Sequence, residues 1–226
     1  MDLELNERVV LVVGGTGRIG RAVASRLREE GATVVVASRH AHDGLVLDAR
    51  DDESVRRGIA RVLDDHGRLD ALVVTAAPAA QTLDPARSSD PAQVLEALDA
   101  KALAFLRVAE AALPVMVDAG YGRIVGVSGQ NAFMTGNIAG TVRNAALVIT
   151  AKNLADQVAG SGVTVNTVNP GTVSAEPPRE IPRGTGGGCT PAEVADVIAF
   201  LVSPRSSGVS GEAIAIGHRL RGTSGL

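Results

Sequence analysis

The sequence predicts an α/β fold with a single doubly wound parallel sheet of about seven strands and helices on both faces. Apolar runs of strand length recur along the chain, and segments with helical periodicity separate them. The runs are apolar on both faces, which is typical of strands that helices cover on two sides. With 226 residues, the chain can form one such domain with a well-buried core, and we expect a single domain over 1–226.

The elements follow from these runs in order. Strands are expected at 8–13, 33–38, 71–76, 123–128, 163–168 and 213–216, with a weaker one at 45–47. Helices are expected at 18–30, 52–66, 91–118, 141–159 and 191–203. Asp51 and Thr190 are expected to cap two of these helices, and Pro191 and Glu193 support the second cap. Glycines 31, 67, 120 and 160 stand where helices should end.

One stretch, 174–189, is too rich in proline and glycine for a regular element. We expect it to be a flexible loop over the substrate rather than a domain boundary.

Composition narrows the function classes. The net charge is −3 and no run of basic residues occurs, so neither a nucleic acid nor a membrane surface is an expected partner. Cys189 is the only cysteine, which excludes an internal disulfide and favours a reducing compartment. The acidic N-terminus does not resemble a signal peptide, and no apolar stretch is long enough to span a bilayer. We therefore expect a cytoplasmic protein, without a metal site because the four histidines lack ligand spacing.

A glycine-rich loop, VVGGTGRIG at 12–20, joins the first strand to the first helix. Such a loop lets backbone N–H groups approach a pyrophosphate at the positive end of the helix, so the pattern predicts a dinucleotide site. The alternative is a tight structural turn. The candidate cofactor residues of this loop are Gly14, Thr16, Gly17, Arg18, Ile19 and Gly20.

The end of the second strand favours NADP(H) over NAD(H). An acidic residue there would bind the ribose hydroxyls and repel a 2′-phosphate, but the chain has Ser38 and Arg39, which can receive that phosphate. The alternative is that Arg39 is merely solvated. Asp48 stands where it can meet the adenine edge, or it can cap a helix.

Several further segments resemble the short-chain dehydrogenase/reductase family. The glycine loop is similar to the family's TGxxxGxG or TGxxGxxG, with Val13 where Thr is usual. LDALVVTAA (69–77) resembles LDxLVNNAG without either Asn, and GVTVNTVNPGTV (162–173) resembles the strand and PG motif beside the nicotinamide. The matches at 112–129 and 190–216 extend the resemblance over nearly the whole chain. It implies a Rossmann fold and adds Ala76, Pro170, Gly171 and Val173 as cofactor residues.

The catalytic motif of that family is missing. Members use a Ser after the fifth strand and then YxxxK, in which the Lys lowers the pKa of the Tyr. Here Gly140 stands at the Tyr position and Asn144 at the Lys position, while Gly129 stands at the Ser position with Ser128 one residue earlier. The only tyrosine, Tyr121, is expected at the opposite end of the sheet.

The family also has an Asn on the fourth long helix. Counting from one side places Lys101 there, and counting from the other places Ala100 there. With Lys101, the family's Asn and Lys would have exchanged places as Lys101 and Asn144; otherwise Lys101 is an ordinary solvated helix residue. Arg143 is a further candidate for binding a substrate carbonyl or carboxylate. Other polar residues near the inferred site are expected either to bind the substrate in this way or to cap the loop: Gln130, Asn131, Thr135 and Thr141.

Three functions stay open from the sequence. The first is a divergent NADP(H)-dependent oxidoreductase on a small carbonyl or hydroxy compound, with protons from water, Ser128 or Lys101. The others are a non-redox enzyme for elimination, isomerisation or cyclisation, and an inactive cofactor-binding sensor or partner subunit. The resemblance also implies a homodimer or homotetramer that packs through helices 91–118 and 141–159, with these apolar residues on the shared face: Ala104, Leu106, Val108, Val148, Leu154 and Val158.

Overall fold

The computed structural model describes the chain except for residues 42, 78–81, 178–179, 184–186 and 218–226. Its seven strands pair in parallel in one sheet, in the order β3-β2-β1-β4-β5-β6-β7. This confirms the predicted fold class. The strands are β1 (Val9–Val13), β2 (Thr33–Ser38), β3 (Leu45–Val46), β4 (Ala71–Val74), β5 (Gly122–Val127), β6 (Val163–Pro170) and β7 (Ala213–Ile216).

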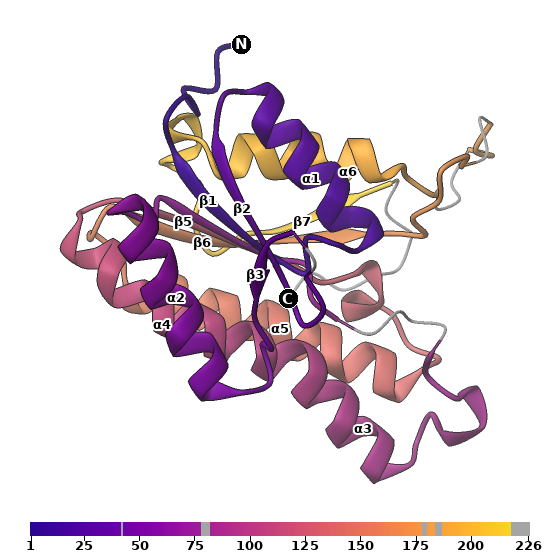
Figure 1. The fold of residues 1–226 in the computed structure, drawn as a ribbon. Coiled ribbons are helices and arrows are strands. Elements are labelled where there is room, and N and C mark those ends of the chain that lie inside the picture. Colours follow the sequence, from indigo (N-terminus) through magenta and orange to yellow (C-terminus); the bar gives the residue numbers. More distant parts are fainter. Residues whose placement is uncertain (42, 78–81, 178–179, 184–186, 218–226) are drawn as a thin grey trace.

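Helices cover both faces of the sheet (Figure 1). α1 (Arg18–Glu29) and α6 (Pro191–Leu201) pack together on one face. α2 (Asp52–His66), α4 (Ala104–Asp118) and α5 (Ile138–Gln157) cover the other, and α3 (Pro91–Leu98) packs against α5. Among the described residues, the two largest apolar clusters lie one under each layer of helices.

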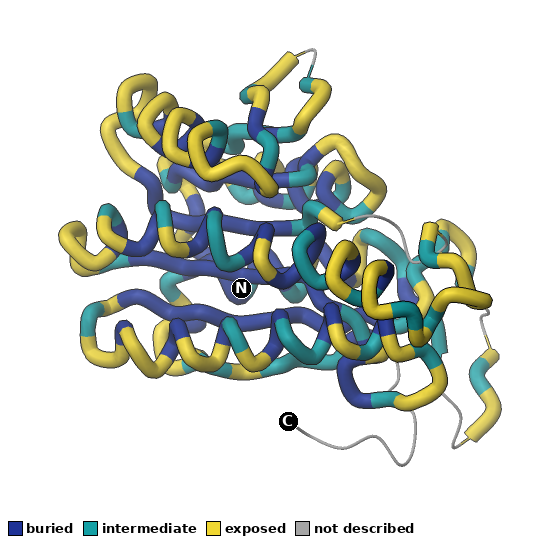
Figure 2. Tube along the Cα trace, turned by 90° about the horizontal axis from the view of Figure 1, so that it is seen from below, coloured by how far each residue is buried: buried dark blue, intermediate teal, exposed yellow. Residues whose placement is uncertain are grey.

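The central strands β1, β4, β5 and β6 are buried at every position, as Figure 2 shows by the dark tubes between the lighter helices. Their two-sided apolar runs are therefore explained by burial on both faces. No helix in the described part of the chain combines the length and the hydropathy that crossing a membrane would need.

Three of the predicted helix ends are confirmed. The Asp51 side chain accepts a hydrogen bond from the backbone N–H of Ser54, and Thr190 forms a reciprocal capping box with Glu193. Gly67 ends α2 in the left-handed region, with φ of 72°. At these points the local sequence was sufficient because capping depends on neighbouring residues.

Two predicted boundaries were wrong. The helix expected at 91–118 is divided into α3 and α4 by a π-helical turn at Asp99–Leu103. The helix expected from residue 141 begins at Ile138, because the Asn137 side chain accepts a hydrogen bond from the N–H of Gly140 and caps an earlier turn. In the irregular stretch at 174–189, the described residues contain no helix, and Val173 pairs with Cys189 in one isolated bridge.

The predicted apolar face for assembly also needs correction. Most of the residues named for it are buried inside the subunit, including Val108 at 0% and Leu154 at 4% exposed. Ala104, Val108, Leu154 and Val158 belong to the core under the helices, and Val148 belongs to a smaller apolar cluster. The apolar side chains that α4, α5 and the preceding turn do expose are Leu103, Val117, Ile138, Val142 and Ile149.

Candidate active site

The glycine loop turns so tightly that side chains are excluded. Gly14 has φ of +82°, and a Cβ there would lie 2.6 Å from the backbone nitrogen of Ala76 and 2.7 Å from Oγ1 of Thr75. A Cβ on Gly20 would overlap the carbonyl oxygen of Gly14. The loop and the end of β4 are therefore in contact, which brings the candidate residues Gly14, Gly20 and Ala76 together.

The first turn of α1 carries no side-chain cap in the part of the chain that the structure describes. Side chains cap α2, α3, α5 and α6. The candidate residues Thr16, Gly17 and Arg18 are exposed at this end, and Ile19 is half-buried. Exposed N–H groups and the helix dipole favour an anion at such a terminus.

The end of β2 lies beside β1 in the sheet. The Ser38 hydroxyl is buried and has no hydrogen-bond partner among the described residues, whereas Arg39 is exposed. Asp48 does not cap α2: its carboxylate accepts a hydrogen bond from the N–H of Arg50 at 3.0 Å and shapes the preceding turn. Its possible contact with an adenine stays a prediction.

The end of β6 supplies the other side of the candidate cofactor site. Asn169 is fully buried, and its Oδ1 has no hydrogen-bond partner among the described residues. Pro170 ends the strand and Gly171 follows it, at a position where a Cβ would lie 2.8 Å from the carbonyl oxygen of Gly187. Arg18 donates a hydrogen bond to the carbonyl oxygen of Val173 at 3.1 Å, so it links the start of α1 to the chain after β6.

Lys101 lies in the π-helical turn between α3 and α4 and is buried, with 6% of its surface exposed. Its Nζ donates a hydrogen bond to the backbone oxygen of Ser128 at 2.9 Å. The alternative of a solvated lysine is therefore wrong. A π turn adds one residue to the helical repeat and is frequent at functional sites; here it contains the lysine that turns toward the end of β5.

Ser128 and Asn144 complete this cluster. The Ser128 hydroxyl donates to the backbone oxygen of Asn144 at 3.0 Å, and Asn144 Nδ2 donates to the backbone oxygen of Gly140 at 2.8 Å. Both residues are buried. The structure thus brings Lys101, Ser128 and Asn144 together, while their roles stay predictions.

Burial dominates the electrostatics of this cluster. It lowers the pKa of Lys101 from 10.5 to about 7, and the neighbouring positive charge of Arg143 contributes in the same direction. Arg143 is itself 4% exposed, and desolvation lowers its pKa as well. A lysine that titrates near neutrality can exchange a proton with a substrate at physiological pH.

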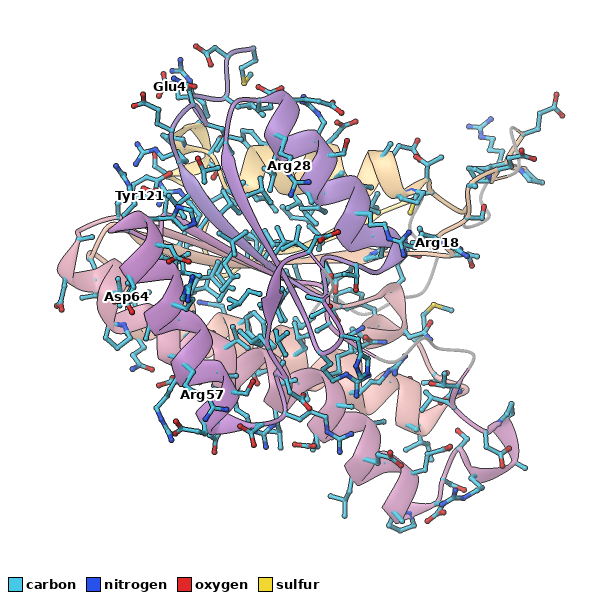
Figure 3. All side chains as sticks on the ribbon, in the orientation of Figure 1. Glu4, Arg18, Arg28, Arg57, Asp64 and Tyr121 are labelled. Atoms are coloured by element: carbon cyan, nitrogen blue, oxygen red, sulfur yellow. The ribbon has the colours of Figure 1, made fainter. Side chains whose placement is uncertain are left out.

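No tyrosine can serve this cluster. A Cβ on Gly140 would lie 3.1 Å from Oδ1 of Asn137, and a Cβ on Gly129 would lie 3.4 Å from Nδ2 of Asn144. Figure 3 shows Tyr121 and Arg18 at opposite ends of the sheet, as expected. The Tyr121 ring lies between the guanidinium groups of Arg8 and Arg123, 4.3 and 4.4 Å from its centroid.

Most polar side chains of the loop after β5 support the backbone. Gln130 Nε2 donates to the backbone oxygen of Ile216 at 2.9 Å, and Thr141 Oγ1 donates to that of Met134 at 2.8 Å. Asn131 and Thr135 are exposed.

Sequence reasoning missed Ser88, whose hydroxyl accepts a hydrogen bond from the N–H of Ile138 at 3.0 Å. It also missed the cap at Asn137. The preference of Asn for the N-cap position could have revealed Asn137. No local pattern could have revealed Ser88, because it is 50 positions away from Ile138.

The doubly wound sheet, whose first glycine loop opens at the switch point between β1 and β4, defines a Rossmann-type α/β protein. Residues 15–218 match the family model described as enoyl-(acyl carrier protein) reductase. The chain belongs to the short-chain dehydrogenase/reductase family of oxidoreductases.

Named relatives and solved structures agree with this assignment. The chain is 28% identical over 247 residues to the 3-oxoacyl-[acyl-carrier-protein] reductase FabG of Vibrio harveyi, covering 94% of this chain and 96% of the relative. It is 29% identical over 226 residues to the reductase MabA of Mycobacterium tuberculosis, covering 92% and 91%. The crystal structure of gox2181 superposes with a TM-score of 0.82 at 25% identity, covering 95% and 96%. The aldohexose dehydrogenase of Thermoplasma acidophilum shares the fold, with a TM-score of 0.82 at 21% identity over 100% and 98% of the chains.

Proposed function

We propose that this protein is an NADP(H)-dependent oxidoreductase for a small carbonyl or hydroxy compound, in which Lys101 replaces the missing Tyr as the proton donor. The names of the similar proteins support the reaction class, since FabG and MabA are 3-oxoacyl reductases. The observation that carries the proton-transfer proposal is the buried Lys101 beside Ser128, at the end of β5.

The residues present fit a nicotinamide dinucleotide. The uncapped first turn of α1 and the exposed Gly17 suit a pyrophosphate, and Gly14 permits a backbone approach that no side chain would allow. The Oδ1 atom of buried Asn169 is a hydrogen-bond acceptor without a partner in the described chain, near the end of β6. When bound, the nicotinamide supplies or accepts the hydride.

Ser38 and Arg39 support the preference for NADP(H). A buried hydroxyl without a partner is costly unless a ligand satisfies it, and the Ser38 hydroxyl is such a group. The exposed guanidinium of Arg39 beside it can form charge-assisted hydrogen bonds to a 2′-phosphate.

Lys101 is the best proton donor of the cluster. The hydroxyl of Ser128 is engaged with the backbone oxygen of Asn144, and the side-chain amide of Asn144 is engaged with Gly140. An amide also cannot supply a proton near neutral pH, whereas burial holds the pKa of Lys101 at about 7. In the reductive direction, the Lys101 ammonium would give its proton to the carbonyl oxygen of the substrate.

The test has two stages. NADPH and NADH are first titrated against the protein by calorimetry, and NADPH should bind more tightly. Oxidation of NADPH is then followed by its absorbance with a panel of ketones and oxo acids, for the wild type and for Lys101→Met. Loss of turnover in the variant with unchanged NADPH affinity supports the proposal. Tight binding of NADPH without oxidation by any compound would instead favour the non-redox or non-catalytic functions.

We propose in addition that the protein is a homodimer or homotetramer. Five exposed apolar side chains of α4, α5 and the π turn support this, since they form candidates for burial against a second copy: Leu103, Val117, Ile138, Val142 and Ile149. Light scattering at micromolar concentration tests it, and a mass of one chain would contradict it.

A further inference from the structure

We propose that Asp99 is a positioning residue, whose carboxylate pairs with Arg107 across the π-helical turn and thereby holds Lys101 against Ser128. This inference rests on the proposed function, in which Lys101 is the proton donor, and adds a residue that acts through it. Asp99 itself does not touch the substrate.

Asp99 is the first residue of the π turn. The backbone N–H of Ala104 donates to the backbone oxygen of Asp99, five residues earlier, which is the hydrogen bond of a π turn. The turn adds one residue to the helical repeat and so rotates Lys101 by about 100° relative to one of the flanking helices, the angle between successive residues of an α-helix. Whatever stabilises the π turn therefore also sets the direction of Lys101.

The ion pair between Asp99 and Arg107 spans this turn. Nη2 of Arg107 lies 2.8 Å from Oδ1 of Asp99, eight residues earlier in the chain. In a continuous α-helix, residues eight apart differ by about 80° around the helix axis, whereas residues seven apart differ by only about 20°. The π turn takes one residue out of this count and brings the two side chains onto the same face. The pair therefore favours the π turn over a regular helix.

Further contacts hold both partners of this ion pair. Nε of Arg50 lies 2.8 Å from the other carboxylate oxygen of Asp99, and the carboxylate of Asp52 lies 3.3 Å from Nε of Arg107. Partial burial opposes the ionisation of Asp99, but hydrogen bonds from Arg107 and Arg50 outweigh it and hold the pKa of its carboxyl below the usual range. A connected network of charges constrains a side chain more firmly than an isolated exposed pair does.

The position of Lys101 needs such a constraint. Burial disfavours the charge of its ammonium group. The hydrogen bond from its Nζ to the backbone oxygen of Ser128, at 2.9 Å, offsets only part of that penalty. A long side chain of this kind turns its charged end toward water where the backbone allows it. The pair of Asp99 and Arg107 opposes this by fixing the backbone beneath Lys101.

The test follows Lys101 directly, because the chain contains only two lysines, Lys101 and Lys152. Protein labelled with ¹³C-lysine should give two side-chain signals, and the exposed Lys152 is an internal control. In Asp99→Ala the midpoint of the Lys101 titration should rise by about one pH unit or more, because the released ammonium regains water. Loss of a nearby negative charge would by itself lower this midpoint, so the sign of the shift separates positioning from a field effect. Arg143, the charged neighbour of Lys101, is present in every variant.

Matched variants complete the titration. Arg107→Gln should also raise the midpoint, although it removes a positive charge, and no field effect moves the midpoint in the same direction for both variants. The double variant should shift no further than the larger single one, since both break the same pair. Asp99→Glu keeps the carboxylate and should retain the wild-type midpoint. Asp65→Asn, which breaks the exposed pair with Arg61 on α2, should leave Lys101 unmoved.

Turnover gives a second readout. Oxidation of NADPH with the ketone panel should be at least ten-fold slower in kcat for Asp99→Ala, with an unchanged KM for NADPH, and Asp99→Glu should restore it. A Lys101 midpoint that is unmoved or lower in Asp99→Ala, in protein with wild-type circular dichroism, overturns the positioning role. If that variant misfolds, an unmoved midpoint in Arg107→Gln overturns it equally. Wild-type protein that oxidises no NADPH would remove the proposed function alone, because the lysine titration needs no turnover and still decides the role of Asp99.

Discussion

Replacing Lys101 by Met removes the buried ammonium and keeps the length of the side chain. The pKa of this lysine falls from 10.5 to about 7 on folding, mainly because burial disfavours its charge. Each pH unit of such a difference corresponds to about 1.4 kcal/mol, so the protonated lysine opposes folding by about 5 kcal/mol at most.

The sign follows from proton binding. Between pH 7 and 10.5 the unfolded chain holds the lysine proton more firmly than the folded protein, so the free energy of unfolding of the wild type should rise with pH in this window. Below pH 7 both states carry the proton and the full penalty applies. The Lys101→Met variant has no such penalty at any pH. The difference in free energy of unfolding between the variant and the wild type should therefore shrink by about 3 kcal/mol between pH 7 and 9.5.

Urea unfolding at a series of pH values from 6 to 9.5 measures this difference. The lost hydrogen bond to Ser128 offsets the whole curve by about 1 kcal/mol without changing its slope. Burial also raises the pKa of Cys189 and of Tyr121, but these groups are present in both proteins and cancel in the comparison. Lys152→Met is the control, since that side chain is exposed. If the difference in free energy of unfolding between the wild type and Lys101→Met stays constant over this pH range, burial does not lower the pKa of Lys101.

Three further predictions concern the cofactor and the missing motif. Gly14→Ala should destabilise the protein by about 2–4 kcal/mol, because it adds backbone strain and overlap with neighbouring atoms. Gly67 also has a positive φ, but a Cβ there would meet nothing within 4 Å, so Gly67→Ala should cost only about 1 kcal/mol. Equal urea midpoints for the two variants would contradict the clash at Gly14. Arg39→Ala should weaken NADPH binding by about 1–2 kcal/mol and leave NADH nearly unchanged in calorimetry, and equal losses would exclude a contact with the 2′-phosphate. The double variant Gly140→Tyr with Asn144→Lys should raise the rate of ketone reduction, since a positioned general acid typically contributes about 10²–10⁴-fold, and an unchanged rate would show that the pocket itself differs.

Local signals in the sequence were sufficient for the elements that depend on neighbours. The apolar runs predicted all seven strands, and Asp51, Thr190 and Gly67 marked helix ends that the structure confirms. The π-helical turn at Asp99–Leu103 was not predicted, because the residues on each side of it keep helical spacing and the extra residue has no sequence signature of its own. The early start of α5 depends partly on Ser88, which local patterns cannot connect to it.

The sequence by itself determined the fold class and the glycine loop, and it predicts that the family's Tyr and Lys are replaced, because these follow from residue identity and short-range spacing. Only the tertiary structure decided what Lys101 is. Aligning the chain with the family's Asn position left Lys101 as either a solvated residue or a member of the site. The direction of a side chain depends on the local helical geometry and on the elements that pack against it. The π turn directs Lys101 to Ser128, and the packing of α5 buries it beside Arg143. Burial and the neighbouring charge, which no linear pattern encodes, lower its pKa toward neutrality.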